Sequence, residues 1–442
     1  MLFSRKFIAL AMGGAAILLL MTLFTSITLA QAGVFLLMYN GFLLLLILGD
    51  WFLTPKPTGL LVQRLFEHRL SLGVSNPITL EIRNSTGVDL ELTIKDEPPV
   101  NFKVSAKVLN CKVPAMAAAK ISYNVEPDKR GDYTFGHVNI RYPSRMGFFI
   151  RQFKATGENT ATKVYPNIME IRKYRILAQQ GHLLEGGLKP SRIIGMGTDF
   201  ESLRDYQVDD EYRRINWGAT ARRGRLTSNQ YEVDKSQNIL LVLDAGRMMT
   251  GEVRGLTKLD HAINASLLLG YVGVTRDDKV GLAVFADDVK LFIPPRKGQS
   301  QLQKILGSLY NIQPDLVESD YAAACRYIST KNRKRSLICI FTDLIDEEAS
   351  RRLITYVSTL TGNHLVVCIT LVDSLLVQKA AQVPADSQEV YEKGVAQGVL
   401  HQRDRAISQL KNRGVVVVNV PPEELSVAAI NKYLEIKNLS RL

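Results

Sequence analysis

The sequence predicts three parts in chain order: a pair of membrane-spanning helices, an antiparallel β-sandwich and a doubly wound α/β domain. Three observations support this fold class. Two apolar runs occupy residues 7–30 and 34–53. Short stretches of alternating apolar and polar residues follow, from about 60 to 168. From residue 238 onward, continuous Val/Ile/Leu runs alternate with segments of helical period, which is typical of a parallel sheet covered on both faces.

The first 55 residues predict a transmembrane hairpin. Each apolar run is long enough for a membrane helix of about 20 residues. Arg5 and Lys6 precede the first run, Lys56 follows the second, and the expected turn at 31–33 has no cation. Cytoplasmic flanks are rich in Lys and Arg, so we expect both termini and the soluble domains in the cytoplasm. A cleaved signal peptide is the alternative for the first run, but a second run follows at once.

Composition narrows the function classes. The chain has 442 residues, of which 46% are hydrophobic and 22% charged, and its net charge is +12. Such a charge fits either nucleic acid or an anionic membrane surface. Acids are interspersed among the basic residues and no nucleic-acid-binding module is recognisable, so the membrane is favoured. The four cysteines form no CxxC motif and no close pair with His, which predicts free thiols and no zinc site.

Residues 60–168 predict the β-sandwich. Apolar residues alternate with polar ones at 78–82, 90–94, 121–125 and 138–142, with turn residues between these runs. Short alternating strands at this spacing are typical of antiparallel sandwiches. No residues here suggest site chemistry, so a support or interaction role is expected.

Residues 169–237 predict a linker followed by a charged motif. The Gly-rich stretch 181–197 lacks the spacing of a phosphate-binding loop, so ATP binding is not expected. Between 199 and 225 carboxylates alternate with cations that are all Arg. The planar guanidinium group of Arg forms two parallel hydrogen bonds to one carboxylate, which favours fixed structural ion pairs. Anion binding or catalysis, and docking of a partner, remain as alternatives.

This motif resembles a bacterial family signature. The pattern G-x-D-F-x-x-L-R-x-Y-x-x-D-D-x-x-R-x-I-x-W-x-A-x-A-R, which starts at Gly197, is similar to that of the domain-of-unknown-function 58 family. The residues that carry the expected structural or interaction motif are Asp199, Phe200, Leu203, Arg204, Tyr206, Asp210, Arg213, Trp217 and Arg222. The resemblance implies an inner-membrane protein with a von Willebrand factor A-like domain and a MoxR-type AAA+ ATPase as partner. The resemblance implies no established reaction.

Residues 238–442 predict the α/β domain. Buried strands are expected at 239–244, 280–285, 337–343, 365–371 and 415–420, with a hairpin at 279–293 giving one antiparallel edge. Helices are expected at 258–275, 299–310, 321–330, 347–360, 399–411 and 422–437. In such folds, ligands bind at the carboxyl ends of the strands.

The resemblance to von Willebrand A domains implies a magnesium site at that edge. Asp244 matches the first Asp of the D-x-S-x-S motif, Ser319 stands for the Thr of a second loop, and Asp343 matches the Asp of a third loop. Gly246 and Met248 replace the two serines, which removes two oxygen ligands that Mg²⁺ requires. We therefore favour a degenerate site whose acids are neutralised by hydrogen bonds or by Arg, with Arg247 as a nearby candidate.

Three functions follow from these patterns. The favoured one is a non-enzymatic membrane-anchored adaptor that presents the A-like domain to a protein partner. No hydrolase or protease motif and no Walker lysine is found. The second is a metal-assisted hydrolase using Asp244 and Asp343. The third is a lipid-surface scaffold without an ATPase, with basic residues facing anionic lipid at Arg64, Arg69, Lys103 and Lys107.

Overall fold

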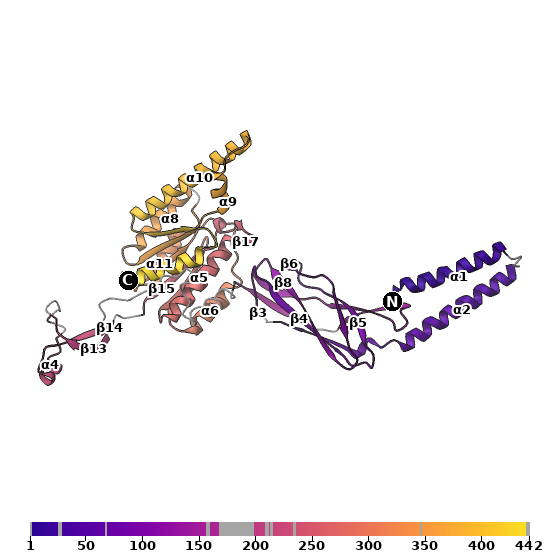
Figure 1. Cartoon of the computed structure of the whole chain (residues 1–442). Helices are drawn as coiled ribbons and strands as arrows, with labels where there is room; N and C mark the ends of the chain where they lie inside the picture. The colour runs from indigo at the N-terminus through magenta and orange to yellow at the C-terminus, as the bar shows by residue number, and fades with distance from the viewer. Residues whose placement is uncertain are drawn as a thin grey trace. The chain divides into compact units, whose positions relative to one another are not determined.

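The computed structural model describes most of the chain in two compact units, Met1–Val164 and Tyr165–Leu442. The described residues are 2–24, 29–66, 69–155, 160–167, 199–207, 212, 215–232, 236–344 and 347–438. Figure 1 shows the elements of each unit. The Gly-rich stretch 181–197 lies outside the described residues, and the finer domain boundaries stay predictions.

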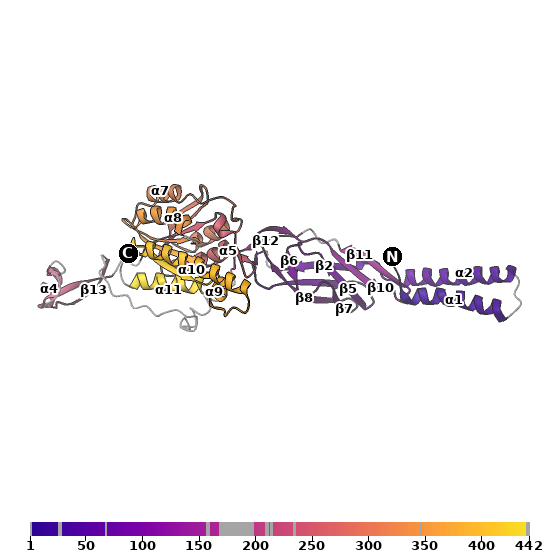
Figure 2. The ribbon, with the colours of Figure 1, turned by 90° about the horizontal axis from the view of Figure 1, so that it is seen from above.

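Two apolar helices open the first unit. They are α1 (Arg5–Phe24) and α2 (Leu29–Leu53), and by length and composition both are able to cross a membrane. They lie side by side (Figure 2). The Tyr39 hydroxyl donates to the Leu10 carbonyl at 2.6 Å, and a Cβ at Gly14 would lie 2.0 Å from the Tyr39 ring, so only glycine fits there. The predicted turn at 31–33 is wrong, because these residues belong to α2.

Both ends of the helix pair are bonded to β-structure of the same unit. Asp50, in the last turn of α2, is fully buried and accepts hydrogen bonds from the Ser144 hydroxyl at 2.5 Å and the Met146 amide at 2.8 Å. Strand β1 (Leu2–Phe3), just before α1, pairs with β11 (Phe149–Ala155). The start of α1 and the end of α2 are therefore held on one loop and strand.

The rest of this unit consists of antiparallel sheets. Their orders are β2-β4-β8-β6, β1-β11-β10-β5-β7 and β3-β12-β9. Buried and exposed residues alternate along β4 and β5, as expected for strands with one buried face. Several antiparallel sheets are thus confirmed, while their assembly as a sandwich stays a prediction. The strands not yet bounded are β2 (Leu60–Leu65), β3 (Arg69–Ser71), β4 (Asn76–Asn84), β5 (Leu90–Asp96), β6 (Phe102–Val104), β7 (Leu109–Val113), β8 (Ala118–Pro127), β9 (Gly131–Thr134), β10 (Val138–Pro143) and β12 (Ala161–Tyr165).

A buried ion pair joins two of these sheets. The Arg64 Nη2 on β2 lies 2.5 Å from the Asp96 Oδ1 on β5, and both side chains are at most 5% exposed. The Tyr123 hydroxyl donates to Asp96 Oδ2 at 2.6 Å, and burial raises the pKa of Tyr123 above its usual range. The hypothesis that Arg64 faces lipid is therefore wrong, because its guanidinium is enclosed between the sheets.

A six-stranded sheet forms the centre of the second unit. Its order is β19-β18-β15-β20-β21-β22, and every pair is parallel except β18 with β19. The predicted antiparallel edge is present. The strands are β15 (Asn238–Asp244), β18 (Lys279–Phe285), β19 (Val289–Arg296), β20 (Leu337–Phe341), β21 (Leu365–Leu371) and β22 (Val416–Val420). Short strands β16 (Glu252–Val253) and β17 (Leu256–Thr257) pair outside this sheet.

Helices bury both faces of this sheet (Figure 1). On β15, Leu241 and Leu243 belong to a core with helices α5, α6 and α11, whereas Leu240 and Val242 belong to a core with α7, α8 and α10. This explains why β15 is apolar at every position from Ile239 to Leu243 instead of alternating. The bounds are α5 (Lys258–Thr275), α6 (Gln299–Leu309), α7 (Tyr321–Lys331), α8 (Glu347–Leu360), α10 (Ser387–Asn412) and α11 (Leu425–Asn438).

The sequence underestimated the helices near the C-terminus. Helix α9 (Ser374–Ala381) has no predicted counterpart, and α10 begins 12 residues before the predicted 399. Both α9 and the first half of α10 are largely exposed, so they show little apolar periodicity. The last helix starts at Leu425 and not at Pro422.

Candidate functional site

The two strand-end carboxylates predicted at the sheet edge have different surroundings. Asp244 ends β15 and is fully buried. Its Oδ1 accepts hydrogen bonds from the Ser319 hydroxyl at 2.5 Å and the Gly246 amide at 2.9 Å. Its Oδ2 accepts from the hydroxyls of Tyr321 and Thr342, both at 2.7 Å. Hydrogen bonds alone, from four donors, thus satisfy this carboxylate.

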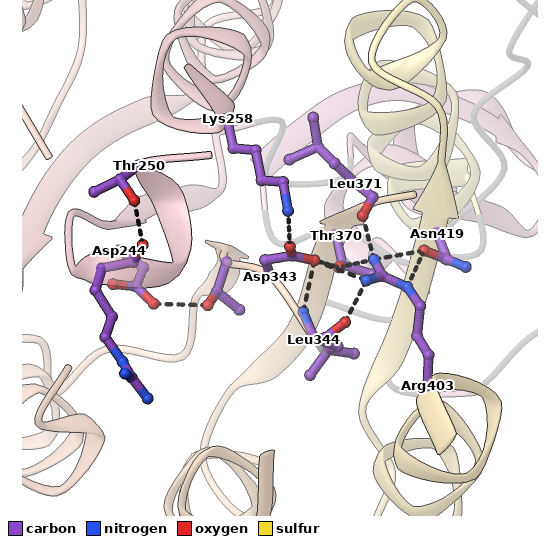
Figure 3. Close-up of polar contacts among 11 residues, drawn as sticks. Asp244, Thr250, Lys258, Asp343, Leu344, Thr370, Leu371, Arg403 and Asn419 are labelled. Carbon is purple, nitrogen blue, oxygen red and sulfur yellow. Dashed lines mark hydrogen bonds and ion pairs between the residues drawn. The ribbon is translucent and has the colours of Figure 1, made fainter. Parts of the chain in front are cut away.

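Asp343, just after β20, is instead held between two cations (Figure 3). The Lys258 Nζ lies 2.5 Å from Asp343 Oδ2, and the Arg403 Nη1 lies 2.8 Å from Oδ1. The Asp343 side chain is only 1% exposed. A buried carboxylate requires such partners, because an unpaired buried charge is strongly destabilising.

Arg403 also ties together the ends of three strands. From α10 it donates to the carbonyls of Leu344 and Leu371, to the Thr370 hydroxyl at 2.6 Å, and to the Asn419 side chain at 3.1 Å (Figure 3). These acceptors belong to β21, β22 and the segment after β20. Sequence reasoning missed Arg403 and Lys258, which lie 60 and 85 residues from Asp343 in the chain.

Burial also keeps nearby groups in their neutral forms. The Tyr321 hydroxyl is enclosed beside Asp244, and this burial raises its pKa well above its usual value. Burial likewise raises the pKa of the Cys368 thiol to about 12. All four cysteines are free, and Cys325, Cys339 and Cys368 are buried. Neither the phenol nor the thiol is therefore an ionised nucleophile near neutral pH.

The residues present do not fit a magnesium ion. All four carboxylate oxygens of Asp244 and Asp343 already accept hydrogen bonds, and Lys258 and Arg403 neutralise Asp343. A Cβ at Gly246 would lie 2.1 Å from the Ser319 hydroxyl oxygen, so the motif serine has no room there. Within the described ranges, no group of three or more His, Cys, Asp and Glu is placed to hold a metal. Arg247 pairs with Glu318 at 3.0 Å, so its suggested role as the neutralising cation is wrong.

This geometry predicts that the stability of the full chain does not depend on magnesium. In detergent, adding Mg²⁺ or EDTA should change the melting temperature by less than about 1 °C, because bound ligand would otherwise stabilise the folded state. The variant Lys258→Met, which removes the cation from Asp343 Oδ2, is measured in the same way for comparison. A saturable rise in the melting temperature of the wild-type chain with Mg²⁺ would contradict the prediction.

An open pocket lies at the same sheet edge. Its volume is about 450 Å³, and its walls include Ser319, Asp343, Arg247, Arg351 and Arg352. Among the described side chains of the wall, Glu318 is the one exposed acid; it pairs with Arg247 at 3.0 Å and lies 4.0 Å from Arg352. Since the inner carboxylate is already neutralised, the described side chains of the rim carry excess positive charge. It suits an anionic group more than a cation.

The charged motif forms a small hairpin with a helix. Strands β13 (Asp199–Asp205) and β14 (Thr227–Glu232) pair, and α4 (Trp217–Arg223) lies between them in the chain. Asn216 caps α4 through the Ala219 amide at 2.9 Å. Asp210 and Arg213 lie outside the described residues, and for Asp199 and Phe200 only the backbone is described.

The polar and aromatic side chains of this motif are largely exposed. Arg225 pairs with Asp205 at 3.0 Å, but both are more than half exposed, so the pair contributes about 0.2–1 kcal/mol. Arg222 donates to the Gly218 carbonyl, Arg204 to the Asp205 carbonyl, and Leu203 and Tyr206 are half-buried. Trp217 is 66% exposed. Trp217 is therefore not part of a buried core, and its structural or interaction role stays a prediction.

We expect Trp217→Ala to change the stability of the chain by less than about 0.5 kcal/mol, as is usual for exposed sites. Ile215→Ala is the matched comparison, because Ile215 is 7% exposed and forms a bridge with Ser228. It should lower stability by about 2 kcal/mol or more. Thermal unfolding of both variants checks this, and a larger loss for Trp217→Ala would restore the structural interpretation.

The fold defines a class of protein that has an N-terminal pair of apolar helices, antiparallel sheets and a mostly parallel α/β unit. Residues 202–389 match the model of the family described as "Protein of unknown function DUF58". This match confirms, over that region, the resemblance seen in the sequence.

Curated relatives are uncharacterized proteins. The chain is 23% identical over 155 residues to the uncharacterized protein Rv1480 of Mycobacterium tuberculosis. The aligned region covers 35% of this chain and 49% of that protein. It is 23% identical over 190 residues to the uncharacterized protein YeaD of Bacillus subtilis, covering 43% of this chain and 44% of YeaD. The chain thus spans about half the length of these relatives.

Solved structures are more distant. The conserved hypothetical protein BatB from Bacteroides thetaiotaomicron has 12% identity and a TM-score of 0.30, covering 45% of this chain and 99% of that one. A native alpha-2-macroglobulin fragment from Escherichia coli has 13% identity and a TM-score of 0.21, covering 26% of this chain and 17% of that one. These scores are too low to assign a fold or a function.

Proposed function

We propose that this protein is a non-enzymatic adaptor, anchored in the bacterial inner membrane by α1 and α2 with its soluble parts in the cytoplasm. Its α/β unit acts as a von Willebrand A-like domain that binds a protein partner. The observation that carries the proposal is the sheet edge itself. Asp244 and Asp343 are fully engaged by internal donors, while an open arginine-rich pocket lies beside them.

This arrangement favours binding over catalysis. A hydrolase that used Asp244 and Asp343 as metal ligands would first have to break the ion pairs of Asp343 with Lys258 and Arg403. The exposed cations Arg247, Arg351 and Arg352 can instead meet an acidic side chain of a partner, which would compete with Glu318 for Arg247 and be desolvated in the pocket. The ligand class that fits is an acidic segment of a protein.

The partner that the family resemblance implies is a MoxR-type AAA+ ATPase. Such an adaptor would hold the ATPase at the membrane and couple nucleotide-driven changes to the assembly or activation of other proteins. The helix pair supports the membrane part of this proposal, because both helices are long and apolar enough to span a bilayer. The pairing of β1 with β11 holds the start of α1, and the hydrogen bonds of Asp50 with Ser144 and Met146 hold the end of α2, on the same loop and strand, as a hairpin requires.

The proposal is tested by mild crosslinking of the full chain in native membranes, followed by purification with and without ATP. We expect an AAA+ ATPase whose recovery depends on nucleotide. Arg351→Glu/Arg352→Glu, which reverses the charge of the pocket rim, should abolish that recovery. Arg296→Glu, at an exposed position on β19, is the matched control and should not. If no ATPase is recovered, the proposed partner is wrong. If the double variant still recovers the ATPase, the pocket is not where the ATPase binds.

A further inference from the structure

A second cavity lies in the first unit, where α2 ends. Its volume is about 530 Å³, and its walls include Trp51, Phe52, Lys56, Thr58 and Arg151. Trp51 and Phe52 are in the last turn of α2 and are 44% and 83% exposed. Aromatic residues at the end of a membrane helix lie at the level of the lipid head groups.

Arg151, on β11, is the unusual residue of this cavity. Arg151 is 8% exposed, and its guanidinium carbon lies 4.5 Å from the centre of the Trp51 ring. Its Nη1 and Nη2 donate to the carbonyls of Pro55 at 3.0 Å and Trp51 at 3.2 Å, and its buried Nε has no hydrogen-bond partner. In the part of the chain that the structure describes, no carboxylate pairs with it.

A buried guanidinium without a counter-ion is destabilising unless an anion neutralises it. The neighbouring acid Asp50 does not do so, because its oxygens accept hydrogen bonds from Ser144, Met146 and Phe148. Lys56, exposed on the cavity wall, adds a second cation, and Thr58 adds a hydroxyl donor. This donor set matches a phosphate group, for which Arg provides paired N–H donors.

The apolar surroundings point to the source of that phosphate. Phe52 lines the cavity, and along α2 Leu45 and Leu48 are 69% and 46% exposed, so acyl chains can lie against this helix below the cavity. We propose that the cavity binds the phosphate head group of an anionic phospholipid, with Arg151 and Lys56 as its cations. This inference rests on the proposed membrane anchoring, since the lipid comes from the bilayer that holds α1 and α2. Basic pockets beside membrane helices are known to bind anionic head groups.

The test uses the full chain purified in mild detergent, with bound lipid counted by native mass spectrometry. Phosphatidylglycerol, phosphatidylcholine and inorganic phosphate are the probes. We expect one phosphatidylglycerol per chain, bound at least about tenfold more tightly than phosphatidylcholine. Lys56→Gln and Arg151→Gln should each weaken that binding about tenfold, the loss expected for one hydrogen bond to a charged group. The matched control Lys112→Gln, whose side chain is 83% exposed, should not change it.

Equal binding of the two lipids would overturn the proposal. So would unchanged phosphatidylglycerol binding by the Lys56→Gln chain, which keeps all contacts of Arg151 and so remains informative if Arg151→Gln fails to fold. Saturable binding of inorganic phosphate that displaces the lipid would show a phosphate site that is not selective for lipid, and would also overturn it. Extraction of native membranes with alkaline carbonate distinguishes failure of the proposed anchoring from failure of the lipid site. A chain that is released is not anchored in the membrane. A chain that is retained but shows no lipid preference refutes only the lipid site.

Discussion

Replacing Arg403 by Met should lower the free energy of unfolding by about 3–5 kcal/mol, the usual loss when one partner of a buried ion pair is removed. Asp343 would keep only Lys258 as a charged partner, and the carbonyls of Leu344 and Leu371 would lose their donor. Thermal unfolding of the full chain in detergent measures this, at about 2–4 °C for each kcal/mol in a unit of this size.

Arg405→Met is the matched control for this experiment, because Arg405 is exposed on the same helix. It should change stability by less than about 0.5 kcal/mol. In the double variant Arg403→Met/Asp343→Asn, the buried carboxylate is gone, so the combined loss should be smaller than the sum of the two single losses. Additive losses would show that the two side chains act independently and that the ion pair is not the source of the effect.

Replacing Asp50 by Ala should release the loop that holds the end of α2. The Ser144 hydroxyl and the amides of Met146 and Phe148 would lose their acceptor in a buried site. Each buried donor left unsatisfied costs about 1–3 kcal/mol, so the three donors together give an expected total of at least about 3 kcal/mol. Hydrogen exchange of the Met146 and Phe148 amides in detergent should therefore accelerate at least about 100-fold, since 1.4 kcal/mol corresponds to a factor of ten.

Glu91→Ala provides the comparison for Asp50→Ala. Glu91 is 66% exposed and pairs only with Lys112, which is 83% exposed, among the ion pairs of the described residues, so exchange near residues 144–149 should stay at its wild-type rate. Protection of Met146 and Phe148 that survives in Asp50→Ala would mean that β1 and β11 alone hold this loop in place.

The strands buried on both faces were the most predictable part of the fold. Residues 239–244 and 365–371 were expected as strands and lie in β15 and β21, because an unbroken Val/Ile/Leu run has no other stable position in an α/β domain. Short strands such as β3 and β9 have only 3 and 4 residues, which is too short for an alternating pattern to show. The helix hairpin turn was misplaced because Gly33 suggested a break that the helix tolerates.

The candidate site was predictable only in part. Asp244 and Asp343 stand at strand ends, so the topology alone brings them to one edge. Their partners carry no such signal: Lys258 is the first residue of α5, and Arg403 lies in the middle of α10. Their approach to Asp343 depends on how the helices pack against the sheet. The exposure of Trp217 was equally hidden, since an aromatic residue in a mixed motif is compatible with a core or with a surface.

The pairing of β1 with β11 sets an order of events during synthesis. Ser4 donates its hydroxyl to the carbonyl of Gly147, 143 residues further along the chain. At about 5–20 residues per second, the ribosome needs roughly 10–30 s before the partner of β1 exists. Both apolar helices have left the ribosome by then, so the backbone of the first strand stays without its partner during this time. A bulky fusion partner placed before β1 would hinder this late pairing of β1 with β11, whereas a fusion partner at the C-terminus would not.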